Sequence, residues 1–163
     1  MKVIPIHYIP AIPVSNWLAI ENEAKEIAKF IDGKDYGEYK QGIFALHAAQ
    51  VNPNPFDYFV LNQEVLGTVI GELGSRYIIN PKIEPFPPEI AREVKEGCVS
   101  FPHRGQRYVK RAYVCNVEYD VPNPKSPNGL KHEKKQVQGV LAQIFQHECD
   151  HSLGKNIHFK GPK

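Results

Sequence analysis

Apolar side chains recur at helical spacing in two segments, one near each end of the chain. In residues 16–31 they lie three and four positions apart, which predicts an amphipathic helix capped by Ser15. The members of this stripe are Trp17, Ile20, Ala24, Ile27 and Ile31. The same spacing in residues 136–152 predicts a second helix, with Gly154 at the position where helices commonly end.

Shorter runs of β-type residues occupy the middle of the chain. Runs bounded by Pro, Asn or Gly predict short strands at residues 56–61, 76–79 and 96–101. Residues 108–119 alternate between apolar and polar side chains, which predicts one longer strand. Residues 62–75 fit either a hairpin or a loop, and residues 121–135, dense in Pro, Asn, Lys and Gly, predict a polar loop.

These elements predict a single α+β domain over residues 1–163. The chain shows no internal repeat and no linker long enough to divide it, and its length fits one domain of roughly 100–200 residues. We expect short antiparallel β-sheets packed around the C-terminal helix, with the N-terminal helix on the outside.

Composition and charge exclude several classes of protein. Hydrophobic residues make up 42% of the chain and charged residues 23%, as in a globular domain rather than a disordered or fibrous protein. A formal net charge of +2 gives no indication of a specific nucleic-acid partner. The chain has no run of about 18 apolar residues and no evident leader, so we expect no membrane span and a cytoplasmic location.

The C-terminal helix carries the pattern His147-Glu148-Cys149-Asp150-His151. Histidines at positions i and i+4 share one helical face, so both imidazoles can bind one metal ion. Glu148 lies next to the first of them, where a carboxylate can handle a proton of an activated water molecule. The histidines continue the apolar side of the helix, and buried imidazoles are unfavourable unless a partner such as a metal ion satisfies them.

A catalytic site of this type needs a third protein ligand and one open position. Few residues follow His151, so we expect the third ligand upstream, where His, Asp, Glu or Cys would serve. Cys98 is the strongest candidate, because the neighbouring Gly97 allows close approach of the backbone. A buried apolar thiol is the alternative role for Cys98.

Two motifs together resemble the peptide deformylase family. The first is Glu-Gly-Cys-Val-Ser at residues 96–100, and the second is Gln-His-Glu-Cys-Asp-His at residues 146–151. The resemblance spans about residues 10–160, with supporting matches at residues 78–82, 109–111 and 139–142. Two motifs with chemically linked roles, in the right order, make it specific.

A third family motif, usually G-x-G-L-A-A-x-Q, is only partly present at residues 43–50. Its leucine, its second alanine and its final glutamine, Gln50, are retained, whereas both glycines and the first alanine are altered. Ala45 and His47 therefore place side chains where the family's backbone lies against the substrate peptide. These differences affect substrate preference and rate more than the metal site, and His47 is interpreted as a packed residue beside the site.

The resemblance implies removal of the formyl group from the N-terminal formylmethionine of newly made proteins, with release of formate. It implies that Glu148 takes a proton from the attacking water and later delivers it to the departing amine. The side-chain amide of Gln50 and the backbone N–H of Val99 would stabilise the negative charge that develops on the formyl oxygen.

The resemblance also implies which residues contact the substrate and which support the site. Arg111 would pair with Glu96, and Asp150 would orient a ligand or hold the helix in place. Gln143 stands where the family usually has an aliphatic residue near its methionine pocket. The expected substrate contacts are Phe44, Ala45, Leu46, Glu96, Gly97, Val140, Gln143 and Ile144.

By the same resemblance, Cys98, His147 and His151 hold one divalent metal ion per chain. Ferrous iron is the expected ion, with zinc or nickel as alternatives in purified protein. The expected partners are N-formylmethionyl nascent peptides, together with a weak contact to the ribosome. The chain is expected to be a monomer.

Two other functions would use the same residues. A zinc endopeptidase of the H-E-x-x-H type would cut internal bonds of unfolded proteins, whereas a deformylase would act on formylated N-termini. A non-catalytic metal- or peptide-binding module would fit the altered first motif, but it would need neither Glu148 as a proton carrier nor Gln50 as a donor. A structural zinc site would also supply four protein ligands.

Overall fold

The computed structural model describes residues 1–6, 9–32, 43–86, 91–98 and 106–155. Within these ranges, no helix has both the length and the apolar character that crossing a membrane requires. The strand expected at residues 96–101 was wrong in its bounds, because the observed strand covers Ala91–Glu96 and neither Gly97 nor Cys98 belongs to it. Val99 and the two residues after it lie outside the described residues.

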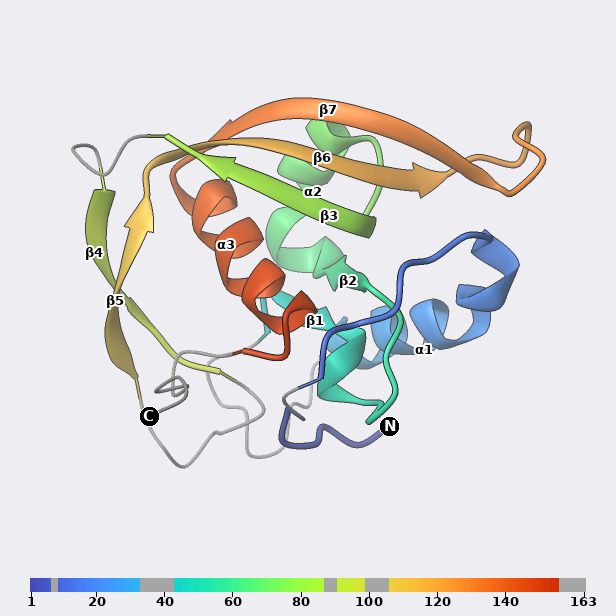
Figure 1. Cartoon of the computed structure of the whole chain (residues 1–163), viewed down its shortest axis with the longest axis horizontal. Coiled ribbons are helices and arrows are strands. Elements are labelled where there is room, and N and C mark those ends of the chain that lie inside the picture. The colour runs from blue at the N-terminus through green and yellow to red at the C-terminus, as the bar shows by residue number, and fades with distance from the viewer. Residues whose placement is uncertain (7–8, 33–42, 87–90, 99–105, 156–163) are drawn as a thin grey trace.

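The described strands form two antiparallel sheets (Figure 1). The larger sheet has five strands in the order β1-β2-β3-β6-β7. Their bounds are β1 Ala45–His47, β2 Tyr58–Leu61, β3 Tyr77–Pro85, β6 Val114–Pro122 and β7 Leu130–Gln138. The smaller sheet pairs β4 Ala91–Glu96 with β5 Arg107–Ala112. Strands β6 and β7 pair over their full length, from Val114 opposite Gln138 to Pro122 opposite Leu130.

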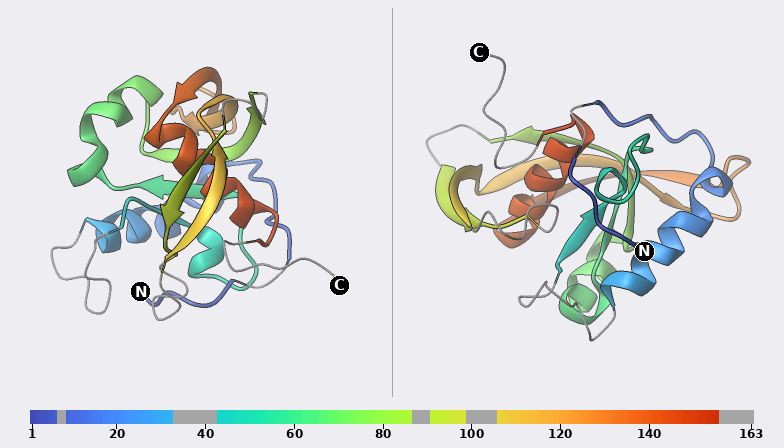
Figure 2. Two further views of the ribbon diagram at one scale, coloured as in Figure 1. Left: turned by 90° about the vertical axis from the view of Figure 1, so that its left-hand side faces the viewer. Right: turned by 90° about the horizontal axis from the view of Figure 1, so that it is seen from below.

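Helices cover both faces of the larger sheet. Helix α1, Glu21–Ile31, packs on one face, and α2, Gln63–Leu73, and α3, Val140–Ser152, pack on the other. Before α1 lies a 3-10 turn, η1 Trp17–Ala19, and its N-cap is Asn16 rather than the expected Ser15. Helix α3 contacts strands of both sheets, which confirms the predicted α+β architecture around the C-terminal helix (Figures 1 and 2).

Strand β2 lies inside the core because both of its faces are covered. Tyr58 and Val60 pack in the cluster that contains α1, whereas Phe59 and Leu61 pack in the cluster that contains α3. Successive residues of a strand point to opposite faces, so one short strand serves both clusters. Phe59 meets Phe145 of α3 edge-on, with ring centroids 5.4 Å apart. This contact holds α3 against the sheet.

Helix α2 fills most of residues 62–75, so the hairpin or loop expected there was wrong. The side chain of Asn62 accepts a hydrogen bond from the backbone N–H of Glu64 and caps the first turn. Gly74, with a φ of 86°, ends the helix. Two glycines inside the segment obscured its helical pattern of buried residues, which are Leu66, Ile70 and Leu73.

The loop expected at residues 121–135 was wrong at both ends, because Val121 and Pro122 still belong to β6 and a further strand begins at Leu130. The second half, and the first residues of the expected C-terminal helix, belong to β7. Within β7 the buried side chains are Leu130 and Val137, so pairing with β6 rather than apolar alternation holds this strand in place. Gly139, with a φ of 63°, makes the turn into α3.

The strand expected at residues 108–119 is divided at Tyr113. Before this residue β5 pairs with β4, and after it β6 pairs with β3 and β7. The predicted alternation is present in β6, whose buried face includes Cys115, Val117 and Tyr119. At Tyr113 the chain therefore leaves the smaller sheet and enters the larger one, and α3 contacts strands of both sheets.

Candidate metal centre

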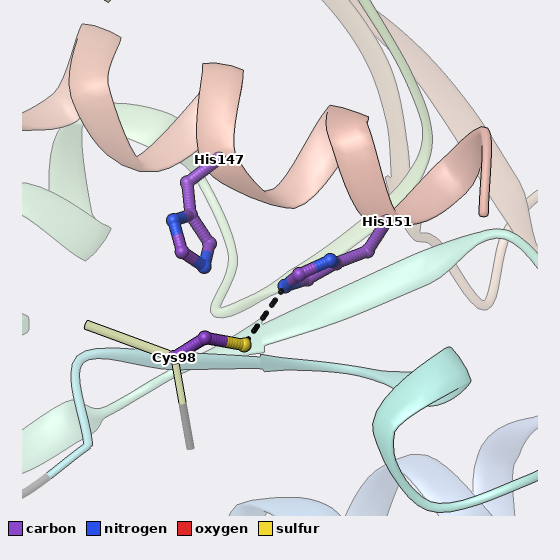
Figure 3. A group of neighbouring side chains, drawn as sticks. All are labelled: Cys98, His147 and His151. Carbon is purple, nitrogen blue, oxygen red and sulfur yellow. Dashed lines mark hydrogen bonds between the residues drawn. The ribbon is translucent and has the colours of Figure 1, made fainter. Parts of the chain in front are cut away.

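Helix α3 presents His147 and His151 on one face (Figure 3). Their rings are nearly perpendicular, with centroids 4.8 Å apart. The i, i+4 spacing explains why one side chain lies above the other. The helix ends at a left-handed Gly154, with a φ of 75°, as the sequence predicted.

Cys98 faces the two imidazoles from the end of the smaller sheet (Figure 3). It lies just beyond the end of β4, and its Sγ is 3.8 Å from Nε2 of His151. The potential ligand atoms of Cys98, His147 and His151 all lie within 4.8 Å of one another. A thiol from the middle of the chain and two nitrogen atoms of the last helix therefore converge on one point.

In each histidine, Nδ1 lies within hydrogen-bond distance of an oxygen atom of another residue. Nδ1 of His147 lies 2.8 Å from Oε1 of Glu96, and Nδ1 of His151 lies 2.8 Å from the backbone carbonyl oxygen of Lys155. An acceptor in this position favours a proton on Nδ1, which leaves the lone pair of Nε2 available inside the cluster. Both rings therefore have the orientation that binding of a metal ion through Nε2 would require.

Glu96 belongs to a buried ion-pair network. Arg111 donates to it from Nε at 2.9 Å and from Nη2 at 2.7 Å, and donates from Nη1 to Asp150 at 2.9 Å. Burial would raise the pKa of Glu96, but hydrogen bonds from His147 and Arg111 outweigh it and lower that pKa to about 2. The pairing expected between Arg111 and Glu96 is thus present, and Asp150 joins it.

The pKa values of the two histidines shift in opposite directions. Burial lowers the pKa of His151 well below its ordinary value. Burial has the same effect on His147, but its hydrogen bonds to Cys98 and Glu96 prevail and raise the pKa to about 10. Positive charge between Cys98 and Glu96 is therefore stabilised, a property that also favours a bound cation.

Glu148 is buried next to these ligands. Its side-chain Oε2 has no hydrogen-bond partner among the described residues. Burial raises the pKa of its carboxyl group. A carboxyl group in this setting holds its proton at a higher pH than an exposed one and can exchange it with a neighbouring molecule, as a general acid and base must.

Gln50 reaches the cluster from η2, Ala48–Gln50, the turn that follows β1. Its Nε2 lies 3.7 Å from Sγ of Cys98. Its Oε1 accepts a hydrogen bond from the backbone N–H of His47 at 2.9 Å. The amide therefore turns its donor group towards the ligand cluster, where a donor for developing negative charge was expected.

The substrate contacts expected around β1 lie at the edge of the larger sheet. Within the described part of the chain, β1 pairs with β2 alone. The side chains of Ala45 and Leu46 are buried, whereas Phe44, just before them, is 52% exposed. Gly97 lies between β4 and Cys98.

Helix α3 carries most of the other expected contacts. Val140 in its first turn is 58% exposed, Gln143 is partly exposed, and Ile144 packs in the core. Glu96 was expected among the substrate contacts as well. Both of its carboxylate oxygens are engaged by the network described above, in contacts with Arg111 and His147.

His47 belongs to a buried group whose other members the sequence did not predict. Its ring is fully buried, with its centroid 6.2 Å from that of His151. Its Nε2 lies 3.2 Å from Oδ1 of Asp57 and 3.3 Å from Oγ of Ser152. The packed position expected for His47 is confirmed, but no motif or spacing pointed to Asp57 or Ser152.

The donor set fits a divalent transition-metal ion. One thiolate and two imidazoles are ligands that iron, zinc, nickel and cobalt all accept. The three donors found among the described residues are one fewer than a structural zinc site requires. The unpartnered, buried Oε2 of Glu148 beside them is a group that water or substrate would satisfy.

Comparison with known proteins gives one family along nearly the whole chain. The family model described as polypeptide deformylase matches residues 10–160. A curated peptide deformylase of Leptospira biflexa is 33% identical over 84 residues, which cover 51% of this chain and 42% of that protein. One of Pelagibacter ubique is 37% identical over 79 residues, which cover 48% and 41%. These matches span about two fifths of the relatives' own length.

Solved structures share the fold over a longer part of the chain. A peptide deformylase from Thermotoga maritima aligns with a TM-score of 0.66 and 28% identity over 96% of each chain. One from Plasmodium falciparum aligns with a TM-score of 0.67 and 28% identity over 95% of this chain and 83% of that one. Both support the architecture described above.

Proposed function

Since the chain belongs to the polypeptide deformylase family, we propose that it removes the N-formyl group from the N-terminal formylmethionine of newly made proteins. Hydrolysis of the formamide bond consumes one water molecule and yields formate and a free amine. The observation that carries this proposal is the convergence of Cys98, His147 and His151 beside the buried carboxyl group of Glu148.

Cys98, His147 and His151 are the residues that would hold the metal ion. When bound, a divalent ion supplies Lewis-acid chemistry, lowering the pKa of water and polarising a carbonyl group. We propose ferrous iron, with zinc and nickel as the ions to compare, because this donor set accepts all three. Three protein donors leave coordination positions for small molecules, as in catalytic rather than structural sites.

Glu148 is assigned the proton transfers. It takes a proton from the attacking water and later gives it to the amine nitrogen as the C–N bond breaks. Two features support this assignment: the raised pKa of its carboxyl group, and an Oε2 atom that no described residue engages. A carboxyl group already tied to a cation could not exchange a proton as readily.

Gln50 is assigned the stabilisation of negative charge on the formyl oxygen. Its carbonyl oxygen is occupied by the backbone N–H of His47, so its donor group faces the cluster. A neutral amide suits this task, because a carboxylate would repel the developing charge. The backbone N–H of Val99 is proposed to stabilise the same negative charge on the formyl oxygen.

The formylmethionyl peptide is proposed to lie along β1. An extended peptide can add to the open edge of a sheet through backbone hydrogen bonds. The exposed side chains of Phe44 and Val140, with Gly97 and Gln143, are the proposed contacts for the rest of the substrate. Nascent chains in the cytoplasm would supply such peptides to a monomeric enzyme in weak contact with the ribosome.

Release of formate from formyl-Met-Ala-Ser tests the proposal. Protein loaded separately with Fe2+, Zn2+ and Ni2+ is compared with Glu148→Ala and with Glu133→Ala, a control on β7 outside the site. We expect the intact protein and the control to release formate, and Glu148→Ala to be slower by at least about 100-fold.

Each other outcome contradicts a stated part of the proposal. Equal rates for the intact protein and Glu148→Ala would remove the proton-transfer role. No formate with any of the three ions would remove the activity. Cleavage of internal bonds in an unfolded protein, without formate release, would favour the endopeptidase.

A further inference from the structure

His47 connects its own turn with two other segments of the chain, one 10 and one 105 residues away. Its Nδ1 accepts a hydrogen bond from the backbone N–H of Ala49 at 2.9 Å and so caps η2. Its Nε2 contacts Asp57, just before β2, and Ser152, at the end of α3. Ser152 Oγ in turn donates to Oδ1 of Asp57 at 2.6 Å.

These contacts define the tautomer of His47. A nitrogen that accepts from a backbone N–H carries no proton, so in the neutral ring the proton lies on Nε2. Nε2–H is then the donor towards Asp57 and Ser152. Both edges of a fully buried ring are thus engaged, and its rotation is blocked.

The same turn determines the orientation of Gln50. The two residues form a reciprocal cap: the His47 side chain accepts from the turn, and Gln50 Oε1 accepts from the backbone N–H of His47. With its oxygen engaged in this way, Gln50 turns its Nε2 to Cys98 Sγ at 3.7 Å. The family motif has alanine at position 47, and a methyl group makes none of the side-chain contacts of His47.

From this arrangement we propose that His47 is a positioning residue that holds the amide of Gln50 towards the metal centre. The ring closes the cap of η2, and Asp57 and Ser152 keep the ring in the capping orientation. Because Ser152 directly follows His151 on α3, its contact with His47 also links η2, the turn that carries Gln50, to the helix that carries His147 and His151. The inference rests on the proposed function, since Gln50 is the donor in that reaction.

A double-mutant cycle tests whether His47 acts through Gln50. We expect His47→Ala to lower kcat for formate release about 10- to 100-fold, with a much smaller change in KM, because the donor is displaced while the rest of the site remains. In a Gln50→Ala background, the same substitution should lower kcat less than about 3-fold. Equal effects in the two backgrounds would overturn the proposal.

A conservative variant guards against simple loss of folding. In His47→Asn, Oδ1 of the asparagine can accept the hydrogen bond that the backbone N–H of Ala49 donates, and asparagine is a strong capping residue. We expect its kcat within about 3-fold of the intact protein. The exposed His132→Ala on β7 is the matched control for removing an imidazole. A His47→Asn protein as slow as His47→Ala would overturn the role of the cap.

A spectroscopic readout separates this inference from the activity itself. In Co2+-loaded protein, an N–H donor to the Cys98 sulfur stabilises the thiolate, so its loss should move the sulfur-to-cobalt charge-transfer band to lower energy. We expect that shift in Gln50→Ala and His47→Ala but not in His47→Asn. This pattern without formate release by the intact protein would refute the proposed function alone. Formate release with an unmoved band in His47→Ala would refute the positioning role alone.

Discussion

Arg111 donates two hydrogen bonds to the carboxylate of Glu96, from Nε at 2.9 Å and from Nη2 at 2.7 Å. The same carboxylate holds Nδ1 of His147 at 2.8 Å. Arg111 lies on β5, Glu96 ends β4, and His147 lies on α3. Charged groups therefore tie the smaller sheet to the ligand helix, and each buried charge depends on its partner.

Removing the charge of Glu96 should weaken metal binding. Glu96→Gln keeps the shape of the side chain but removes the negative charge that faces Nδ1 of His147. We therefore expect metal affinity to fall about 10- to 100-fold. Competition against a chromophoric chelator measures the change. Glu93→Gln, at an exposed position of β4, is the matched control. Unchanged affinity in Glu96→Gln would contradict the assigned support of His147.

Removing Arg111 should destabilise the fold. Arg111→Met leaves the Glu96 carboxylate buried without its cation, and we expect the free energy of unfolding to fall by about 3–5 kcal/mol. Urea unfolding measures it, with the exposed Lys110→Met expected to change by less than about 0.5 kcal/mol. The double variant Arg111→Met/Glu96→Gln should recover part of the loss, and no recovery would show that the unpaired charge is not its cause.

Removing the metal ion should lower thermal stability. A ligand that binds only the native state stabilises it by about 4 kcal/mol when the free ligand concentration is about a thousand times Kd. For a chain of this size, that corresponds to a shift in Tm of about 10 °C. Scanning calorimetry before and after chelation measures this shift. Cys98→Ala should abolish it, whereas Cys115→Ala, a buried thiol in the core, should keep it.

Tyr119 should make the free energy of unfolding fall as the pH rises in the alkaline range. Its hydroxyl donates to the carbonyl oxygen of Leu73 at 2.8 Å, and burial raises its pKa to about 12, above the ordinary value of about 10. A raised acid pKa contributes stability that is present below pH 10 and is lost as the pH rises towards 12. The stability difference between the intact protein and Tyr119→Phe should therefore shrink over this range. The exposed Tyr108→Phe should show no such trend.

Gly154 should matter for both folding and metal binding. Its φ of 75° is unfavourable for other residues, so Gly154→Ala should lower the free energy of unfolding by about 1 kcal/mol. The turn also brings the Lys155 carbonyl to Nδ1 of His151, so metal affinity should fall as well. Gly154→Asn should recover part of both losses, because asparagine tolerates this conformation. Full stability in Gly154→Ala would contradict this account.

The ligand helix could be predicted from sequence because its information is local. Histidines at i and i+4 share a face whatever surrounds the helix, and Gly154 marks its end. Cys98 was a candidate because a third ligand was needed and Gly97 lies beside it, and the family resemblance then implied the same residue, since a lone cysteine gives little local signal. Its distance from His151 depends on how β4 meets α3, which only the tertiary structure determines.

Strand β7 and helix α2 could not be predicted with the same rules. In β7 the polar side chains of an exposed face hide the strand, because the pairing partner β6 supplies the stabilising hydrogen bonds. In α2 the internal Gly67 and Gly71 lower helix propensity, and packing of the apolar face overrides it. Tertiary contacts decide both elements.

The partners of His47 were hidden for a related reason. Asp57 lies 10 residues and Ser152 lies 105 residues from it in the sequence, and neither belongs to a motif. The altered family position drew attention to His47, but the chain alone gave no acceptor for its ring. Buried polar networks of this kind combine residues that only the folded chain brings together.

The oxygen that holds Nδ1 of His151 comes from the backbone of Lys155 and not from a side chain. Any amino acid at position 155 can offer the same carbonyl, so natural variation there should be wide, while position 154 should stay restricted to residues that tolerate a positive φ. A survey of close orthologues that scores side-chain identity would therefore overlook the residue that supports this ligand and would register only its glycine neighbour.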